Sequence, residues 1–281
     1  MYQNSLNYYY YILEPTEKRV YEALFVSYRK MESETFLKGI YDGKEVLRII
    51  QYVYNDNPEF FYIEPTEITY CESVLGIKVI HKYRYGRKQK EEYDRKIKTA
   101  AEAFIKQWIR QGMSLYEKLQ AVNDFLATTV RYDPVVSNAK NTEGKTIRGN
   151  YEDYSIVGPL VNRMGVCHGI SMTAKYLCDI LGIQCMVVTG MVKNEGKHAW
   201  NIVYTGKNEG KRFYHWDPTF NLTNDPRSRL RYRYFMVDDR ELEKNREWNK
   251  KECPACSWKT WDHGKKSLLG QIVYGGRRGR K

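Results

Sequence analysis

Three residue types that together can activate a nucleophile stand between Gly165 and Thr219. A thiol, Cys167, lies in the segment GVCHG, an imidazole, His198, opens the segment HAWNIVY, and a carboxylate, Asp217, lies in HWDPT. A thiol that passes its proton to an imidazole can attack a carbonyl carbon, and a carboxylate can hold the imidazole in the tautomer that this requires. The residue types therefore indicate acyl transfer through a thioester, provided that the fold brings them together.

The spacing around Cys167 predicts that it opens a helix. Apolar residues recur at helical spacing after Gly169, and Gly182 is placed to end the helix. At a helix N-terminus the free N–H groups and the positive end of the dipole favour a thiolate. We expect Gly165 and Gly169 to leave the backbone beside the sulfur open to substrate. His168 emerges about 100° further around the helix and is predicted to line the cleft rather than to ionise the thiol.

The segments 198–205 and 211–219 predict two strands joined by the hairpin loop GKNEG, because both are rich in β-branched and aromatic residues. If the loop is symmetric, His198 lies directly opposite Asp217, and Trp200 lies opposite His215 on the same face. Trp200 is then expected to wall the site and contact substrate, whereas His215 is expected to pack against it. A bulge would shift the register by one residue and separate acid from base. The alternative is a surface hairpin with an incidental His and Asp.

Several blocks of sequence between 154 and 221 resemble the transglutaminase-like superfamily. They are SIVGPLVNRMGVCHG, a helix closing with LGI, a strand ending in Gly190, the segment HAWN, and an aromatic residue before DPT. The resemblance implies an α+β fold with a papain-like core, in which the helix bearing the cysteine packs on an antiparallel sheet bearing His and Asp. It also implies that Cys167 is the nucleophile, His198 the base and Asp217 the residue that orients the base.

The resemblance implies that no metal and no organic cofactor is required, and that the substrate is a protein or peptide. Hydrolysis of a peptide or isopeptide bond is the use we expect. Protein-glutamine γ-glutamyl transfer, by cross-linking or deamidation, is the first alternative, and a non-catalytic protein-binding module on the same fold is the second. Peptide:N-glycanases share this core but carry paired CxxC motifs before the nucleophile, whereas this chain has one such motif after it. The second oxyanion-hole donor cannot be assigned from the sequence.

The cysteine pattern does not indicate a disulfide framework, because six cysteines are spread over 281 residues. Cys253 and Cys256 form a single CPAC motif, which is half of a zinc site. His215 and His263 could complete it, but their spacing follows no recognised zinc pattern. We therefore expect no structural metal.

The formal net charge of +12 is partly concentrated in the segment RSRLRYRY at 227–234. Strand alternation would place its four arginines on one face, either as a solvated surface or as a basic rim that attracts an acidic protein. The aromatic residues between the arginines also fit single-stranded nucleic acid, but no nucleic-acid motif supports that partner. The oligomeric state stays open.

The composition, with 42% hydrophobic residues, is that of an ordered globular protein. No apolar run is long enough to span a bilayer, and the N-terminal segment MYQNSLNYYYYILEP does not resemble a signal peptide. These features predict a cytoplasmic protein without a membrane span.

The pattern of apolar residues divides the chain near Gly112. Helices are predicted at 16–31, 44–53 and 88–110, with strands at 60–63, 67–71 and 77–85. Ser114 and Glu117 form a predicted capping box for a helix over 114–130. We therefore predict an N-terminal α+β region of unknown role at 1–111 and the catalytic core with a basic tail at 112–281. The polar stretch between Tyr132 and Tyr154 is predicted to be either a lid beside the site or a disordered insertion.

Overall fold

The computed structural model describes residues 7–39, 41–134, 151–205, 212–223, 225 and 227–258. Its N-terminal part contains three helices and a three-stranded antiparallel sheet with β3 in the middle. These elements are α1 (Tyr8–Ile12), α2 (Pro15–Lys30), β1 (Glu34–Lys38), α3 (Gly43–Asp56), β2 (Thr69–Ser73) and β3 (Gly76–Ile80). Two 3-10 turns, Pro58–Phe60 and Pro65–Glu67, connect α3 to this sheet.

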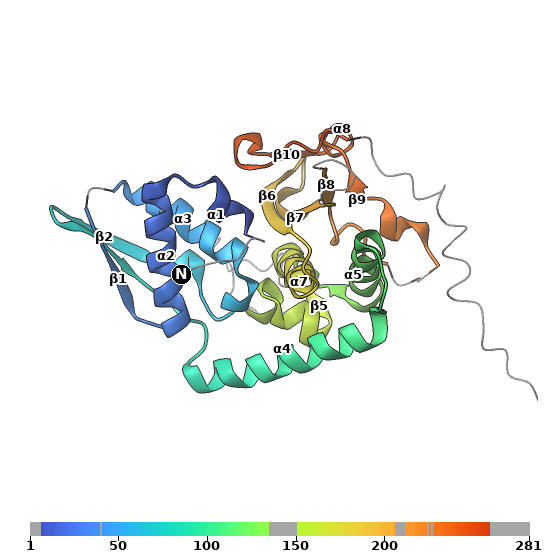
Figure 1. The fold of residues 1–281 in the computed structure, drawn as a ribbon, viewed down its shortest axis with the longest axis horizontal. Coiled ribbons are helices and arrows are strands. Elements are labelled where there is room, and N and C mark those ends of the chain that lie inside the picture. Colours follow the sequence, from blue (N-terminus) through green and yellow to red (C-terminus); the bar gives the residue numbers. More distant parts are fainter. Residues whose placement is uncertain are drawn as a thin grey trace, which may run out of the picture.

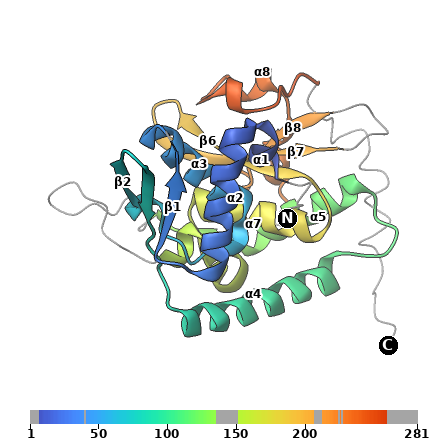
Figure 2. The ribbon, with the colours of Figure 1, turned by 60° about the vertical axis from the view of Figure 1, so that its left-hand side comes forward.

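Two further helices lead from this region to the core. Helix α4 (Arg87–Trp108) runs along one side of the molecule, and α5 (Leu115–Thr129) turns back from its end (Figure 1, Figure 2). The predicted capping box is present, because the Ser114 hydroxyl accepts from the Glu117 N–H and the Glu117 carboxylate accepts from the Ser114 N–H. This cap fixes where α5 begins.

The core is a five-stranded antiparallel sheet with a helix packed against it. The strand order is β10-β6-β7-β8-β9, and α7 contacts both β6 and β7. The elements are α7 (Cys167–Ile180), β6 (Cys185–Val192), β7 (Gly196–Tyr204), β8 (Phe213–Trp216), β9 (Phe235–Val237), α8 (Asp239–Leu242) and β10 (Arg246–Trp248). Short strands β4 (Arg131–Tyr132) and β5 (Met164–Gly165) pair in parallel before α7. The expected α+β fold, with the cysteine helix on an antiparallel sheet, is confirmed.

The region before α7 contains two short helical turns, a 3-10 turn at Tyr151–Tyr154 and a π-helical turn at Gly158–Asn162. The N–H of Val166 donates to the carbonyl of Asp153 at 3.0 Å. The residue after it, Cys167, is the first of α7. The start of α7 is therefore tied to the segment that precedes it.

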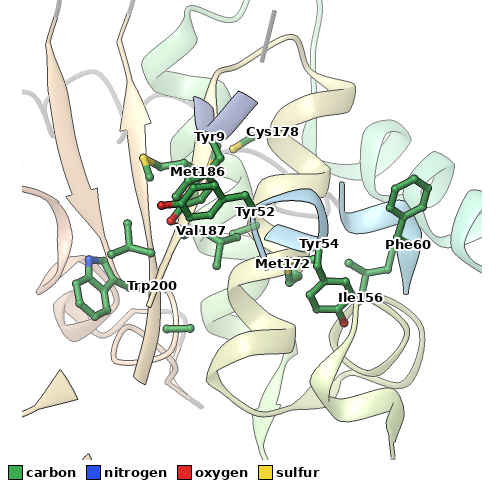
Figure 3. Close-up of a cluster of buried hydrophobic side chains, with 14 of the residues drawn as sticks. Tyr9, Tyr52, Tyr54, Phe60, Ile156, Met172, Cys178, Met186, Val187 and Trp200 are labelled. Carbon is green, nitrogen blue, oxygen red and sulfur yellow. Dashed lines mark hydrogen bonds between the residues drawn. The ribbon is translucent and has the colours of Figure 1, made fainter. Parts of the chain in front are cut away.

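Side chains of the N-terminal part are packed directly against the core sheet. The Tyr9 hydroxyl donates to the backbone carbonyl of Val187 at 2.8 Å, and the Tyr9 ring stacks on Tyr52 with 4.4 Å between centroids. Figure 3 shows both rings beside Val187 and Met186 of β6. One cluster of buried hydrophobic residues includes side chains from both parts. The division at 111–112 accordingly remains a prediction.

Some local predictions differ from the structure. The predicted strand at 60–63 is a 3-10 turn followed by an isolated bridge between Ile63 and Tyr83, and β3 ends at Ile80 instead of continuing to Tyr85. Most of the polar stretch before Tyr154, together with His263 and the basic tail, lies outside the described residues. None of the helices in the described ranges has the length and apolarity that a bilayer span requires.

The arginine-rich segment is not a strand. It contains a 3-10 helix, Arg229–Tyr232, in which the Ser228 side chain accepts from the N–H of Leu230. Arg231 forms an ion pair with Asp124, with 3.0 Å from Nε to Oδ1. The predicted single face of four arginines is therefore wrong, since a helical turn points successive side chains in different directions.

Candidate active site

Cys167 is the first residue of α7 and is half-buried. The N-cap residue, Val166, has no side chain that could cap the helix, and the first turn contains no acidic residue. The thiol therefore lies where the helix dipole and the free N–H groups favour a negative charge, with no competing carboxylate on the same turn.

His198 and Asp217 are hydrogen-bonded to each other. His198 lies on β7, Asp217 follows the last residue of β8, and 2.8 Å separates Nε2 from Oδ2. Burial lowers the pKa of His198, but the charge and hydrogen bond of Asp217, followed by the hydrogen bond and charge of Cys167, raise it to about 9. Because Nε2 is occupied by Asp217, the other nitrogen, Nδ1, is left for the thiol. His198 is therefore favoured in its protonated form beside Cys167.

The predicted register of the hairpin is wrong by two residues. The alignment of Trp200 with His215 would pair Asn201 with Tyr214, but Asn201 pairs with Trp216, and the N–H of Thr205 donates to the carbonyl of Arg212. Continuing this register places Asp217 level with Trp200, so that Asp217 and His198 are diagonal neighbours. A shift of two residues keeps every side chain on its predicted face, since side chains alternate with a period of two. The acid therefore still reaches the base.

Asp217 is fully buried and has further partners that the sequence did not indicate. Arg246 donates to its Oδ2 from Nε at 3.0 Å and from Nη2 at 2.5 Å, and the N–H of Phe220 donates to its Oδ1 at 3.1 Å. Burial raises the pKa of Asp217, but His198 and Arg246 outweigh it and hold the pKa below its usual value. The acid is therefore held as a carboxylate.

The Arg246 guanidinium lies between two aromatic rings, at 4.3 Å from the centroid of Phe220 and 4.6 Å from that of Tyr234. Its side chain is completely buried. Arg246 lies in the charged segment EKNREWNKKE, in which no spacing distinguishes it from its neighbours. Its pairing with Asp217 depends on β10 joining the sheet beside β6, so no local sequence signal could have revealed it.

Of the three predicted substrate-binding residues, Gly169 and Trp200 are buried and His168 is half-buried. A Cβ on Gly169 would lie 2.2 Å from the carbonyl oxygen of Asp153, so this glycine permits close packing and does not expose the backbone. His168 hydrogen-bonds to the Tyr154 carbonyl at 3.1 Å and stacks on Tyr54. Trp200 is completely buried. The contacts of these three residues with substrate stay a prediction.

A cavity of about 330 Å³ lies beside His198. It is lined by Tyr132, Val192, Glu195, Gly196, Lys197, His198, Thr219 and Phe220. The buried Thr219 hydroxyl has no hydrogen-bond partner among the described residues, and the ring of Phe220 meets that of His198 edge-on at 5.2 Å. The cavity thus combines aromatic and apolar residues with the charged residues Glu195 and Lys197.

Asn201 attaches the cysteine helix to the sheet. Its Nδ2 donates to the carbonyl of Ser171 on α7 at 3.0 Å and to that of Met186 on β6 at 3.2 Å. The amide is completely buried. Since Asn201 lies three residues after His198 on β7, this bridge fixes α7 relative to the strand that carries the imidazole.

Comparison with known proteins gives one family match. Residues 102–218 match the model of the transglutaminase-like superfamily, a range that includes Cys167, His198 and Asp217. No curated protein matches the chain.

Similar solved structures include a TGase, at 16% identity and a TM-score of 0.39. The match covers 70% of this chain and 52% of the TGase chain. A candidate cysteine protease from Cytophaga hutchinsonii has 16% identity and a TM-score of 0.32, and the match covers 54% of this chain and 61% of that one. The chain thus spans between half and two thirds of the length of these structures. The match thus supports a transglutaminase-like core over residues 102–218 of this chain.

Proposed function

We propose that this protein is a thiol-dependent acyl-transfer enzyme that hydrolyses peptide or isopeptide bonds through a thioester on Cys167. The observation that carries the proposal is the 2.8 Å hydrogen bond from His198 to Asp217, and the Cys167 thiol contributes with Asp217 to the raised pKa of the same imidazole. A buried acid, a protonated base and a thiol at a helix N-terminus are the parts that nucleophilic catalysis by cysteine needs.

In the proposed reaction the Cys167 sulfur attacks the substrate carbonyl while the Cys167 proton resides on His198. The oxyanion forms beside the N-terminus of α7, where the N–H of Cys167 can donate to it. His198 then protonates the departing amine as the C–N bond breaks, which leaves a thioester. In the second half, water gives a proton to His198 and attacks the thioester, and the carboxylic acid leaves as the thiol is reprotonated. Asp217 keeps Nδ1 of His198 directed at the sulfur.

Hydrolysis is favoured over transfer by the cavity beside His198. Its lining includes the charged residues Glu195 and Lys197 as well as His198, and these polar groups favour the entry of water beside the imidazole. Glutamine γ-glutamyl transfer or deamidation is the alternative, because the aromatic residues Tyr132 and Phe220 in the same cavity could hold the alkyl chain of an amine. A non-catalytic binding module would not require Asp217 to be held as a buried anion.

The first test compares two thiols under limiting iodoacetamide. Cys71 is exposed and Cys167 is half-buried, so accessibility alone predicts that Cys71 is labelled first. We expect the opposite order at pH 7, because Cys167 is the activated thiol. Labelling of Cys71 before Cys167 would overturn the proposal, and the Cys71→Ala variant should keep the labelling rate of Cys167 unchanged.

The second test identifies the reaction. The native protein and the Cys167→Ala variant are incubated with casein and with a glutamine-containing peptide, with and without an added primary amine. Chain cleavage that requires Cys167 supports hydrolysis of peptide bonds. Release of ammonia with incorporation of the amine, and no cleavage, would replace that reaction by glutamine transfer. If Cys167 is labelled no faster than a free thiol and neither reaction occurs, a non-catalytic binding module is the remaining interpretation of this protein.

A further inference from the structure

A second histidine–carboxylate pair lies in the core sheet near His198. Donor atoms of His215, Asp239 and Cys256 all lie within 4.8 Å of one another, an arrangement that could hold a metal ion. His215 is completely buried on β8, Asp239 opens α8, and Cys256 ends the CPAC motif. The first question is therefore whether these atoms are free to bind a metal.

The hydrogen bonds of His215 determine its tautomer. Trp200 donates from Nε1 to Nδ1 of His215 at 3.1 Å, and the indole nitrogen can only donate. Nδ1 must then carry the lone pair, so the proton of the neutral ring lies on Nε2 and is donated to Oδ1 of Asp239 at 2.8 Å. Burial, the largest influence, lowers the pKa of His215, in agreement with a neutral ring.

These bonds disfavour a metal centre. A zinc ion on Nε2 would displace the proton to Nδ1, which faces the Trp200 N–H, whereas metal-binding histidines ordinarily donate from their second nitrogen. The Cys256 thiol donates to the Pro254 carbonyl at 3.8 Å, and burial followed by the charge of Asp239 raises its pKa. All three atoms are therefore already engaged in hydrogen bonds.

The CPAC segment instead fixes Asp239. The N–H of Cys256 donates to Oδ2 of Asp239 at 3.0 Å, and the N–H of Asp239 donates back to the Cys256 carbonyl at 2.8 Å. With Oδ1 bonded to His215, both carboxylate oxygens have partners. A rigid carboxylate thus holds the imidazole that accepts from Trp200.

Trp200 in turn packs beside the base of the proposed active site. Its ring is nearly parallel to that of His198, with 6.0 Å between centroids and 19° between planes. A Cβ on Gly190 would lie 2.6 Å from the Trp200 ring, so glycine at this position makes room for the indole. Trp248 meets Trp200 edge-on at 5.9 Å. The indole is thereby confined on several sides.

We infer that Asp239, His215 and Trp200 form a positioning chain, in which Asp239 fixes the tautomer of His215, His215 fixes the indole by its N–H, and the indole holds the plane of His198. The inference rests on the proposed function, because it assigns to Trp200 the orientation of the base. Trp200 is a positioning residue and does not contact the reacting atoms. The tilt of His198 is the property that Trp200 controls, together with Phe220 at the ring edge, since Asp217 restrains only one edge of the ring.

The matched test is Trp200→Phe against Trp216→Phe. Both tryptophans are completely buried, and Trp216 likewise donates one hydrogen bond, to Oδ1 of Asn123 at 2.9 Å. We expect Trp200→Phe to slow alkylation of Cys167 at pH 7 about tenfold, and Trp216→Phe to change it by less than about twofold, with similar losses of thermal stability. Equal rates of Cys167 alkylation in the two variants would disprove the positioning chain.

A second measurement uses the native protein and does not require activity. Labelling histidine with ¹⁵N and recording long-range ¹⁵N–¹H correlations should identify His215 as the Nε2–H tautomer. The Nδ1–H tautomer, or one zinc ion retained per chain in native protein but not in His215→Gln, would disprove the chain. If Cys167 is not activated even in the native protein, the proposed function is wrong. The tautomer of His215 then still shows whether the positioning chain of Asp239, His215 and Trp200 is present. Asp239→Asn, at a partly exposed side chain, replaces Trp200→Phe if that variant does not fold.

Discussion

Arg246 donates two hydrogen bonds to the oxygen of Asp217 that also accepts from His198. Both side chains of this ion pair are completely buried. Three donors thus converge on Oδ2, while the N–H of Phe220 holds Oδ1. Rotation of the carboxylate would break several of these bonds at once, so the orientation of His198 depends on Arg246 through Asp217.

The substitution Arg246→Lys tests this dependence. Lysine keeps the positive charge but not the planar fork, so the carboxylate loses one of its two bonds and the stacking between Phe220 and Tyr234. We expect the rate of Cys167 alkylation at pH 7 to fall about tenfold while the protein stays folded. The rate is measured with iodoacetamide, and folding is measured by circular dichroism.

The control is Arg84→Lys, at another largely buried ion pair. Arg84 donates from Nε to Oε2 of Glu64 at 3.0 Å, and the two side chains are 5% and 8% exposed. This variant should lose comparable stability and keep the alkylation rate within about twofold. If both variants slow alkylation equally, loss of packing explains the result and Arg246 has no special role.

A second prediction concerns stability and pH. His198 has a folded-state pKa of about 9 against an ordinary value of 6.5, so folding favours its protonated form. The resulting stabilisation is fully present below pH 6.5 and is lost as the pH rises through about 9. We expect the difference in unfolding free energy between the native protein and His198→Gln to shrink by up to about 3 kcal/mol between pH 6 and pH 9. Urea titrations at intervals of pH measure it.

His81→Gln is the matched control for this titration. Burial, the largest influence, lowers the pKa of His81 to about 4, so this ring is neutral throughout the range. Its Nε2 is hydrogen-bonded to the Thr35 hydroxyl at 2.7 Å. The stability difference for His81→Gln should accordingly stay constant from pH 6 to pH 9. A constant difference for His198→Gln as well would show that His198 is not held as a cation.

The start of the cysteine helix and the side-chain faces of the hairpin could be predicted because each depends on local periodicity. Cys167 begins α7 as expected, and the period of two keeps His198 and Asp217 on one face despite the register error. The register itself depends on the shape of the hairpin loop, which the segment GKNEG does not determine. The element and the face that carry each site residue were therefore predicted better than the exact pairing of β7 with β8.

Features that depend on distant elements could not be predicted. Arg246 reaches Asp217 only because β10 pairs with β6, and a three-residue strand has too short a pattern to be recognised. The alternation of Arg and Tyr at 227–234 is typical of a strand. The segment instead contains a 3-10 turn, in which Arg231 forms an ion pair with Asp124 on α5. The Asp153 carbonyl lies beside Gly169, which the sequence does not reveal. The sequence therefore led to the wrong expectation that this glycine exposes the backbone.

A third prediction concerns the N-terminal part. The Tyr9 hydroxyl donates to the Val187 carbonyl at 2.8 Å, and Tyr9 is 4% exposed. Tyr9→Phe should destabilise the protein by about 1–2 kcal/mol, because it removes a buried hydrogen bond across the two parts. Tyr11, which is 62% exposed on the same helix, provides the control, and Tyr11→Phe should change stability by less than about 0.5 kcal/mol. Equal effects in chemical denaturation would mean that this contact does not hold the parts together.

The last prediction tests how the start of α7 is positioned. In Gly169→Ala the new Cβ would meet the Asp153 carbonyl oxygen at 2.2 Å, and that backbone also accepts from Val166, so it cannot move without loosening the helix start. We expect a loss of at least about 2 kcal/mol and slower alkylation of Cys167.

Gly86→Ala is the comparison for Gly169→Ala, since no atom lies within 4 Å of its added Cβ and its φ is −75°. It should be within about 0.5 kcal/mol of the native protein and leave the alkylation rate unchanged. Thermal denaturation and iodoacetamide kinetics measure both variants. A Gly169→Ala protein as stable and as reactive as Gly86→Ala would show that the contact with Asp153 does not position Cys167. In that case the bridge from Asn201 to Ser171 would have to hold the helix start by itself.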